Sequence, residues 1–339
     1  MNNVNTPKKL RLSASRIKEL DNCSWMFYVN NVLRVPQTPH PKTLVGTIVH
    51  SVFEVLKNPR HYHHFVEITS EPNPSIHKSK AIMRMIQSAC KRLGVSYETF
   101  QAEFNGLIQV GLKYDFFHKG ALQVLPPEYE FVLHLEPLEL KGLIDDCAEF
   151  ENEVLIRDFK SQSRQFTDEQ LRDNIQAGIY QLAARKRFNK PARVEFVLLR
   201  FPENPIQTVP PYSEKQLRGL ESYLSKMGEV FKSFTEKEAQ SDFAYNHDDK
   251  KWLCGFARSP GQKKKDGTPM WYCPYKFPVK YFALIDSISG QIISTGFDKQ
   301  KLEAKANFDS QVVEKQYDGC PVFAKFNKGV NNNNDPTFI

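Results

Sequence analysis

The chain has 339 residues, of which 40% are hydrophobic, so it is long enough to bury one large core or two smaller ones. No run of about 18 apolar residues is present, which excludes a transmembrane helix, and the N-terminus MNNVNTPKKL lacks the apolar centre of a signal peptide. Six cysteines at irregular spacing argue against a disulfide framework, so we expect an intracellular protein in a bacterial or phage-infected cytoplasm. The net charge of +7 fits a nucleic-acid partner without demonstrating one.

The N-terminal part is expected to begin with a flexible lead over residues 1–10. A serine at position 13 or 15 can cap a first helix, whose buried side carries Ile17 and Leu20. Three prolines then mark a loop before a second helix. On that helix Gly46 and His50 are four positions apart and share one face. Taken alone, His50 is best explained as a hydrogen-bonded histidine on an amphipathic helix.

Residues 76–120 have mainly helical character. We expect a helical insertion over about 60–125 that covers a DNA channel and ends at Pro126-Pro127. Three strands should follow, over 128–135, 138–150 and 154–160, and together build a sheet.

The last of these strands ends in an acid and a lysine. Because strand side chains alternate between faces, Asp158 and Lys160 share one face, and Phe159 points to the other face and into the core. Taken alone, an Asp-x-Lys tripeptide is common and predicts only a solvated ion pair on a surface hairpin.

The preceding strand supplies a second acid. If Glu151-Asn152 forms the turn, Asp145 lies opposite Asp158, and if Asn152-Glu153 forms it, Asp145 lies opposite Lys160. Either register places both acids on one face, whereas a three-residue loop would not. Facing like charges destabilise a sheet, and a cation such as Mg²⁺ between them would offset that cost.

Downstream, Gln176 and Tyr180 share a helix face, and residues 193–201 alternate as a further strand. A strand, a helix and a strand after a hairpin indicate an α/β fold with a central mixed β-sheet flanked by helices. A proline-rich connection then leads to a capping box at Ser213 and Gln216, which starts a helix reaching about Lys237. The remaining predicted elements are a hairpin over 280–286 and 291–297, a helix over 299–315, and a disordered tail over 327–339.

Several of these motifs, in this order, resemble the PD-(D/E)xK nuclease superfamily. The branch that they fit contains the RecB nuclease domain, the CRISPR-adaptation nucleases and many phage exonucleases. The matching stretches span roughly residues 12–186, and each alone would be weak. They are Ser13-Ala14-Ser15-Arg16 with the following Cys23, Gly46-Thr47-Ile48-Val49-His50, Gly142-Leu143-Ile144-Asp145, Asp158-Phe159-Lys160-Ser161, and Gln176 with Tyr180.

The resemblance implies a restriction-endonuclease-like core and a role for each matched residue. Lys160 would be the catalytic lysine, and Gln176 and Tyr180 would contact it or the DNA. The ligands of Mg²⁺ or Mn²⁺ would be His50, Asp145, Asp158 and the carbonyl of Phe159. At position 146 relatives frequently carry arginine, and the aspartate here leaves the metal pair intact but alters the contact beside it.

Some members of this branch hold an iron–sulfur cluster on one N-terminal cysteine and three C-terminal ones. The corresponding residues here would be Cys23, Cys254, Cys273 and Cys320, but the tight C-x-x-C pair is absent and eighteen residues separate Cys254 from Cys273. We therefore expect ordinary buried cysteines, with a four-cysteine site as the alternative; a zinc site using His247 is no better supported.

A basic, glycine-flanked loop over 261–267 could touch phosphates, although a plain exposed loop explains it equally well. Trp252, Trp271 and Tyr272 flank it and could stack on unpaired bases, but core packing is the expected role for such aromatics.

These patterns predict a metal-dependent DNA nuclease, an exonuclease of recombination, repair or replication acting on single- or double-stranded DNA. The expected division is a nuclease core over 11–201 and, packed on it, a C-terminal part over 202–326. The sequence lacks a G-x-x-x-x-G-K-[ST] motif, so any unwinding would come from a helicase or recombinase partner. The alternative is a DNA-binding or scaffold protein that kept this fold and lost catalysis, with or without a cluster.

Overall fold

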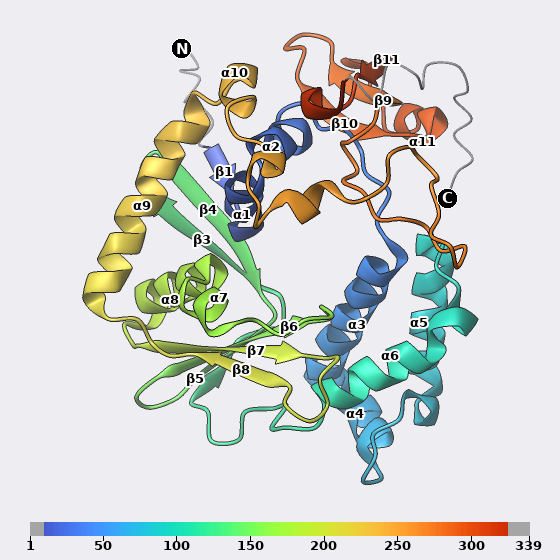
Figure 1. Cartoon of the computed structure of the whole chain (residues 1–339). Coiled ribbons are helices and arrows are strands. Elements are labelled where there is room, and N and C mark those ends of the chain that lie inside the picture. The colour runs from blue at the N-terminus through green and yellow to red at the C-terminus, as the bar shows by residue number, and fades with distance from the viewer. Residues whose placement is uncertain (1–9, 325–339) are drawn as a thin grey trace. The chain divides into compact units, whose positions relative to one another are not determined.

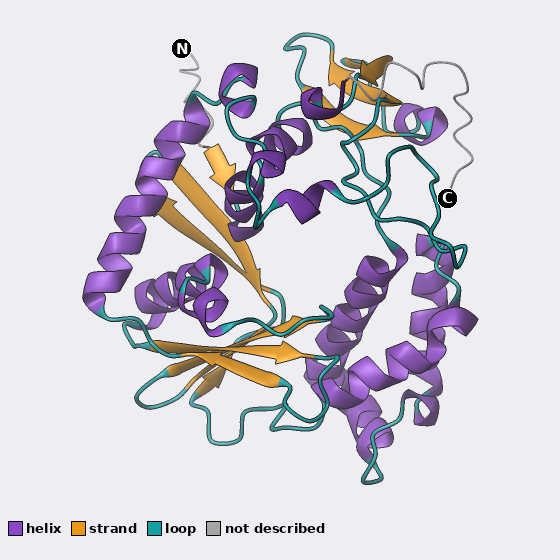
Figure 2. Ribbon diagram, in the orientation of Figure 1, coloured by secondary structure: helices purple, strands orange, loops and turns teal. Residues whose placement is uncertain are grey.

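The computed structural model describes residues 10–324 and divides them into two compact units (Figures 1 and 2). The first unit contains residues 10–14 and 39–229, and the second contains residues 15–38 and 230–324. Compared with the predicted division after residue 201, the segment up to 229 groups with the core, and the segment 15–38 groups with the C-terminal part. The predicted tail, and the lead before Leu10, lie outside the described residues.

The first unit is built on a mixed sheet, as the sequence predicts, and this sheet has five strands. Its strand order is β2-β5-β6-β7-β8, in which β6 pairs antiparallel with β5 and parallel with β7. Strand β6 is buried along almost its whole length, which agrees with its continuous apolar run. The bounds are β2 Gln123–Val124, β5 Asp146–Glu149, β6 Val154–Lys160, β7 Ala192–Leu198 and β8 Ile206–Val209.

A second sheet of three strands has the order β1-β4-β3, formed by Leu10–Leu12, Leu138–Ile144 and Tyr129–Leu135 respectively. The prediction of one continuous strand over 138–150 is therefore wrong, as is the prediction of a single sheet that contains the strands over 128–135 and 154–160. The chain leaves the small sheet after Ile144 and enters the large sheet at Asp146, because β4 finds its hydrogen bonds in β3 and β5 finds them in β6. Asp145 lies at the switch between the two sheets.

Helices from the N-terminal half and strands of the large sheet enclose one apolar core. This core contains Ile48 and Phe53 of α3, Phe104 of α6, and Phe159 and Val197 of the sheet, so Phe159 faces inward as predicted. The predicted helical segment ends at Gly111 rather than at residue 120. These helices are α3 Pro41–Lys57, α4 Tyr62–Thr69, α5 Lys80–Leu93 and α6 Tyr97–Gly111.

Helix α8 (Ile175–Phe188) crosses over from β6 to the parallel β7 and contacts strands of both sheets (Figure 1). The short α7 (Asp168–Arg172) precedes it, and α9 (Glu214–Lys232) packs along it. A Cβ atom at Gly178 would lie 2.6 Å from a methyl carbon of Leu220, so the glycine lets α9 approach closely. The predicted capping box of Ser213 and Gln216 starts α9, although the helix ends at Lys232 rather than Lys237.

The second unit has its own apolar core and a three-stranded antiparallel sheet of order β10-β9-β11. The predicted hairpin is confirmed as β9 and β10, but the predicted helix over 299–315 is wrong. The helix stops at Glu303, because residues 310–317 pair along the whole of β9 and gain a full ladder of backbone hydrogen bonds. The elements are α1 Ala14–Asn22, α2 Ser24–Asn31, α10 Glu236–Ala239, β9 Val279–Asp286, β10 Ile292–Gly296, α11 Lys299–Glu303 and β11 Ser310–Tyr317.

Among the helices of residues 10–324, none combines the length and the apolar character that crossing a membrane requires.

Candidate active site

Asp145 lies opposite an acid on each of its two sides. The β5–β6 register pairs Asp146 with Arg157, so its extension places Asp145 opposite Asp158. Of the two turns that the sequence allows, the one at Glu151-Asn152 is therefore the correct one. Side chains opposite one another across antiparallel strands share a face, so both carboxylates lie on the same side.

The second acid opposite Asp145 is Glu128, which the sequence analysis did not assign to the site. The β3–β4 register pairs Tyr129 with Ile144, and its extension places Glu128 opposite Asp145. The backbone N–H of Glu128 donates to the carbonyl oxygen of Asp145 at 3.4 Å. Pairing the predicted strands over 128–135 and 138–150 across a turn at residues 136–137 would have revealed this acid.

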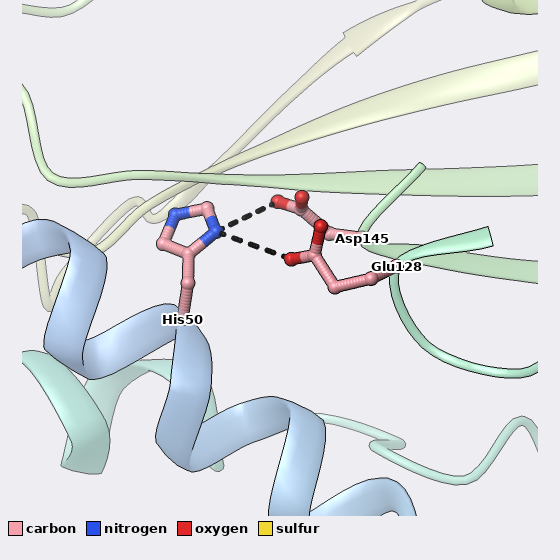
Figure 3. A group of neighbouring side chains, drawn as sticks. All are labelled: His50, Glu128 and Asp145. Carbon is pink, nitrogen blue, oxygen red and sulfur yellow. Dashed lines mark ion pairs between the residues drawn. The ribbon is translucent and has the colours of Figure 1, made fainter. Parts of the chain in front are cut away.

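His50, Glu128 and Asp145 form a group of side chains that can hold a metal ion (Figure 3). His50 Nδ1 lies 3.4 Å from Asp145 Oδ2 and 4.0 Å from Glu128 Oε1, and one ligand atom from each residue lies within 4.8 Å of the others. Ligands placed 2.0–2.1 Å from an octahedral Mg²⁺ are about 3 to 4 Å apart. The donor set therefore fits a small divalent cation.

The negative charge of the site raises the pKa of His50. Burial alone would lower the pKa of this imidazole, but the nearby carboxylates of Asp145, Asp158 and Glu128 outweigh burial and raise the pKa to about 9. Burial and the neighbouring Asp145 also raise the pKa of Glu128. Without a metal, the proton on His50 is the countercharge of the acids, and a bound cation would have to displace it.

The glycine of the Gly-x-x-x-His motif has a steric role. Gly46 lies one turn before His50 on α3, and a Cβ atom there would lie 2.5 Å from Ser161 Oγ. Because Ser161 directly follows Lys160, the missing side chain lets the helix that carries His50 approach the end of β6.

Asp158 and Lys160 are joined in a closed set of bonds with α8. Lys160 Nζ lies 2.6 Å from Asp158 Oδ2 and donates to Gln176 Oε1 at 2.9 Å. Gln176 Nε2 in turn donates to Asp158 Oδ1 at 2.9 Å, and the Tyr180 hydroxyl lies at the same distance from that oxygen. Gln176 and Tyr180 therefore hold both the acid and the lysine in one orientation.

Asp158, which was predicted as a metal ligand beside Asp145, is not one of the three residues of this group. Asp158 is 3% exposed, and burial raises its pKa, with Asp145 adding to the rise and Lys160 opposing it. Its carboxylate is engaged with Lys160 and α8 and lies outside the three-residue group. Of Phe159, the structure shows the backbone N–H donating to Asp145 Oδ2 at 2.8 Å, which orients that ligand.

Asp146, where the resemblance led us to expect arginine, points away from this site. Its carboxylate is buried and bonded to Lys57 Nζ at 2.8 Å and to His118 Nε2 at 2.7 Å. Although burial opposes ionisation, these two partners hold the pKa of Asp146 below its ordinary value. The residue next to Asp145 is therefore part of a buried ion network, which continues to Arg157 and Glu195.

The second unit brings together cysteines that are far apart in the sequence. Cys23, Cys254, Cys273 and Cys320 line one small cavity. The backbone N–H of Cys273 donates to the carbonyl oxygen of Cys254 at 3.2 Å, so the two ends of the eighteen-residue segment between them lie side by side. This convergence has no signal in the sequence spacing, whereas Cys90 and Cys147 are buried in the first unit.

A mixed sheet whose central antiparallel pair carries acids and a lysine, with helices on its faces, defines the restriction-endonuclease-like class of nuclease folds. The model of the PD-(D/E)XK nuclease superfamily matches residues 11–258, and the chain belongs to this superfamily. No curated protein sequence matches the chain.

Two solved structures are similar to the chain at low sequence identity. One is a protein from Eubacterium rectale to which an exonuclease activity is attributed, with 13% identity, a TM-score of 0.38, and coverage of 74% of this chain and 92% of that chain. The other is the protein SSO0001, with 14% identity, a TM-score of 0.22, and coverage of 55% and 85%.

Proposed function

We propose that the protein is a metal-dependent DNA nuclease, an exonuclease acting in recombination, repair or replication. Membership of the nuclease superfamily supports phosphodiester hydrolysis. The observation that carries the proposal is the grouping of His50, Glu128 and Asp145 beside the Asp158–Lys160 pair.

In this proposal His50, Glu128 and Asp145 hold Mg²⁺ or Mn²⁺. A bound divalent ion polarises the scissile phosphate and lowers the pKa of a coordinated water. The ammonium of Lys160, fixed by Asp158 and Gln176, stabilises the negative charge that develops at the reacting phosphorus or orients the attacking water.

The test is cleavage of end-labelled single- and double-stranded DNA, each with free or blocked ends, in Mg²⁺ or Mn²⁺. We expect mononucleotide or short products from free ends only, and none after chelation of the metal. Internal cuts on blocked substrates would make the protein an endonuclease. Binding without cleavage under every metal condition would favour the alternative, a DNA-binding protein that lost catalysis.

We further propose that the four cysteines of the second unit hold an iron–sulfur cluster. Burial first, and then the neighbouring cysteines, raise the pKa of Cys273 and of Cys320 to about 12 each, so four thiolates in this cavity need a compensating cation. Lys276, whose Nζ donates to Ala257 O at 2.7 Å, adds one buried positive charge beside them.

Of the two metal groups that four thiols can hold, we propose a cluster rather than a single zinc ion. Tetrahedral zinc with 2.3 Å bonds holds its sulfurs about 3.8 Å apart. In the part of the chain that the structure describes, no three of these sulfurs lie within 4.8 Å of one another. Several irons and bridging sulfides fill a wider arrangement.

Anaerobic purification tests this second proposal by iron and sulfide content and by visible absorption. Cys254→Ser should remove both signals, while Cys90→Ser, a buried cysteine of the other unit, should leave them unchanged. Stoichiometric zinc in place of iron, or a colourless protein without metal, would refute the cluster.

A further inference from the structure

We propose that residues 252–273 of the second unit form a binding face for single-stranded DNA, which we call the aromatic hairpin. This inference rests on the proposed function only in taking DNA as the ligand. It concerns how an unpaired strand is held, and it is independent of the residues that would cleave it.

Backbone pairing gives the aromatic hairpin a defined conformation. Gly255 pairs with Tyr272 and Lys263 pairs with Pro269 in isolated antiparallel bridges. Between them the Phe256 N–H donates to the Trp271 carbonyl oxygen at 2.8 Å. Gly255 has φ +73° and a Cβ there would lie 2.2 Å from Tyr272 Cα, so only glycine fits at the closed base.

Three large aromatic side chains on this hairpin face solvent. Trp252 is 56% exposed, Phe256 is 68% exposed and Trp271 is 50% exposed. Core packing, the role expected from the sequence, is therefore wrong for the two tryptophans, whereas Tyr272 packs edge-on against Phe277 at 5.1 Å. Clustered exposed apolar side chains usually mark a binding surface.

The same segment is basic. Between residues 248 and 266 there are six lysine or arginine side chains against three aspartates. Lys263, Lys264 and Lys265 are all exposed, and no ion pair joins them to an acid within residues 10–324. Asp266, the acid beside them, has its carboxylate occupied by the N–H and the hydroxyl of Thr268.

Exposed rings beside unpaired lysines match the chemistry of an unpaired nucleic-acid strand. Bases of a single strand offer their flat faces for stacking, and the phosphates offer charge to the lysines. A duplex keeps its bases stacked on one another and would meet only the lysines. We therefore assign the aromatic hairpin to single-stranded DNA.

Tryptophan fluorescence provides a direct assay, because the chain has three tryptophans and the third, Trp25, is 5% exposed. Titrating full-length protein with an oligothymidine in the presence of a chelator should quench the emission without cleavage. In the variant carrying Trp252→Phe and Trp271→Phe, the remaining emission of Trp25 should not respond. Unchanged quenching in this variant would overturn the inference.

Affinity gives a second readout. Trp252→Ala and Trp271→Ala should each weaken binding of the single strand by about 5- to 100-fold while leaving duplex binding within about twofold. Phe308→Ala is the matched control, since Phe308 is fully exposed elsewhere in the same unit. Equal loss for both kinds of DNA, or equal loss in the control, would overturn the inference.

The lysines are tested by replacing Lys263, Lys264 and Lys265 with serine and measuring the salt dependence of binding. A smaller salt slope than for the same change at Lys299, Lys301 and Lys305 is expected. Wild-type protein that binds the strand through the hairpin but never cleaves would refute the nuclease proposal alone. Cleaving protein whose hairpin variants bind normally would refute this inference alone.

Discussion

Lys57 Nζ lies 2.8 Å from Asp146 Oδ2, and both side chains are buried. Asp146 directly follows Asp145 in the chain, and Lys57 lies two turns after His50 on α3. This ion pair therefore links α3, which carries His50, to β5, which begins directly after Asp145. It helps to fix the position of the His50 side chain relative to that of Asp145.

Removing the Asp146 carboxylate from this pair should lower the free energy of unfolding. Asp146→Ala leaves the Lys57 ammonium buried without its partner, and such a loss typically costs about 3–5 kcal/mol. Burial already lowers the pKa of Lys57, and without Asp146 the contacts left to its ammonium would be the Phe116 carbonyl oxygen at 2.6 Å and the Phe116 ring. Urea unfolding of metal-free protein measures the effect.

A double variant distinguishes the effect of losing the ion pair from a general loss of stability. Adding Lys57→Met to Asp146→Ala should recover part of the lost free energy, because the uncompensated charge is gone. The exposed pair Glu130–Lys141 is the control, and its disruption should change stability by less than about 1 kcal/mol. A cost for Asp146→Ala no larger than that of the control would contradict the role assigned to the pair.

The pH dependence of the metal-free protein should report His50. Its pKa is about 9 in the folded state and about 6.5 when unfolded, so the folded state binds the proton more tightly. The resulting stabilisation, roughly 3 kcal/mol, is fully present below pH 6.5 and is lost as the pH rises through 9. Thermal unfolding from pH 6 to 10 should show this decline in the wild type and a much flatter profile in His50→Asn; equal slopes would rule out a perturbed His50.

Glu128 should contribute to metal binding, although the sequence pattern did not predict it as a ligand. Glu128→Gln keeps the shape and removes the charge, and we expect Mn²⁺ affinity to fall by about tenfold or more. Glu130→Gln is the matched control, because Glu130 lies two residues further on, in β3, and is paired with Lys141 at the surface. Calorimetric titration compares the two, and equal affinities would remove Glu128 from the ligand set.

The register of short hairpins explains why one acid could be predicted and the other was missed. Turn chemistry at Glu151-Asn152 limited the alignment of β5 and β6 to two possibilities, and both brought Asp145 and Asp158 to one face. Glu128 needs the register of β3 against β4 as well, and the switch of the chain between two sheets at Asp145 hides it. The sequence has strand character on both sides of that residue, so the pattern alone cannot show that the strand changes partner.

Contacts between residues far apart in the sequence are the second kind of feature that the sequence pattern did not predict. Cys254 and Cys273 meet because the backbone between them closes at its base, and no local pattern encodes that closure or the approach of Cys23 and Cys320. Similarly, the residues of β11 were expected to be helical, because their pairing partner β9 lies more than twenty residues upstream. Local signals such as the capping box at Ser213 were predicted correctly since their partners are three residues away.

The strongest test of the site is Lys160, whose ammonium is held by Asp158 and Gln176. Lys160→Met keeps the length of the side chain and removes the charge, so we expect kcat to fall by about 10²- to 10⁴-fold with Mn²⁺ and DNA affinities within a few-fold of the wild type. Gln176→Ala leaves the ion pair to Asp158 and should cost less. Lys141→Met, at the surface of β4, should cleave normally. If Lys160→Met retained wild-type kcat, the charge at this position would have no part in the reaction, and the assignment of the lysine would have to be abandoned.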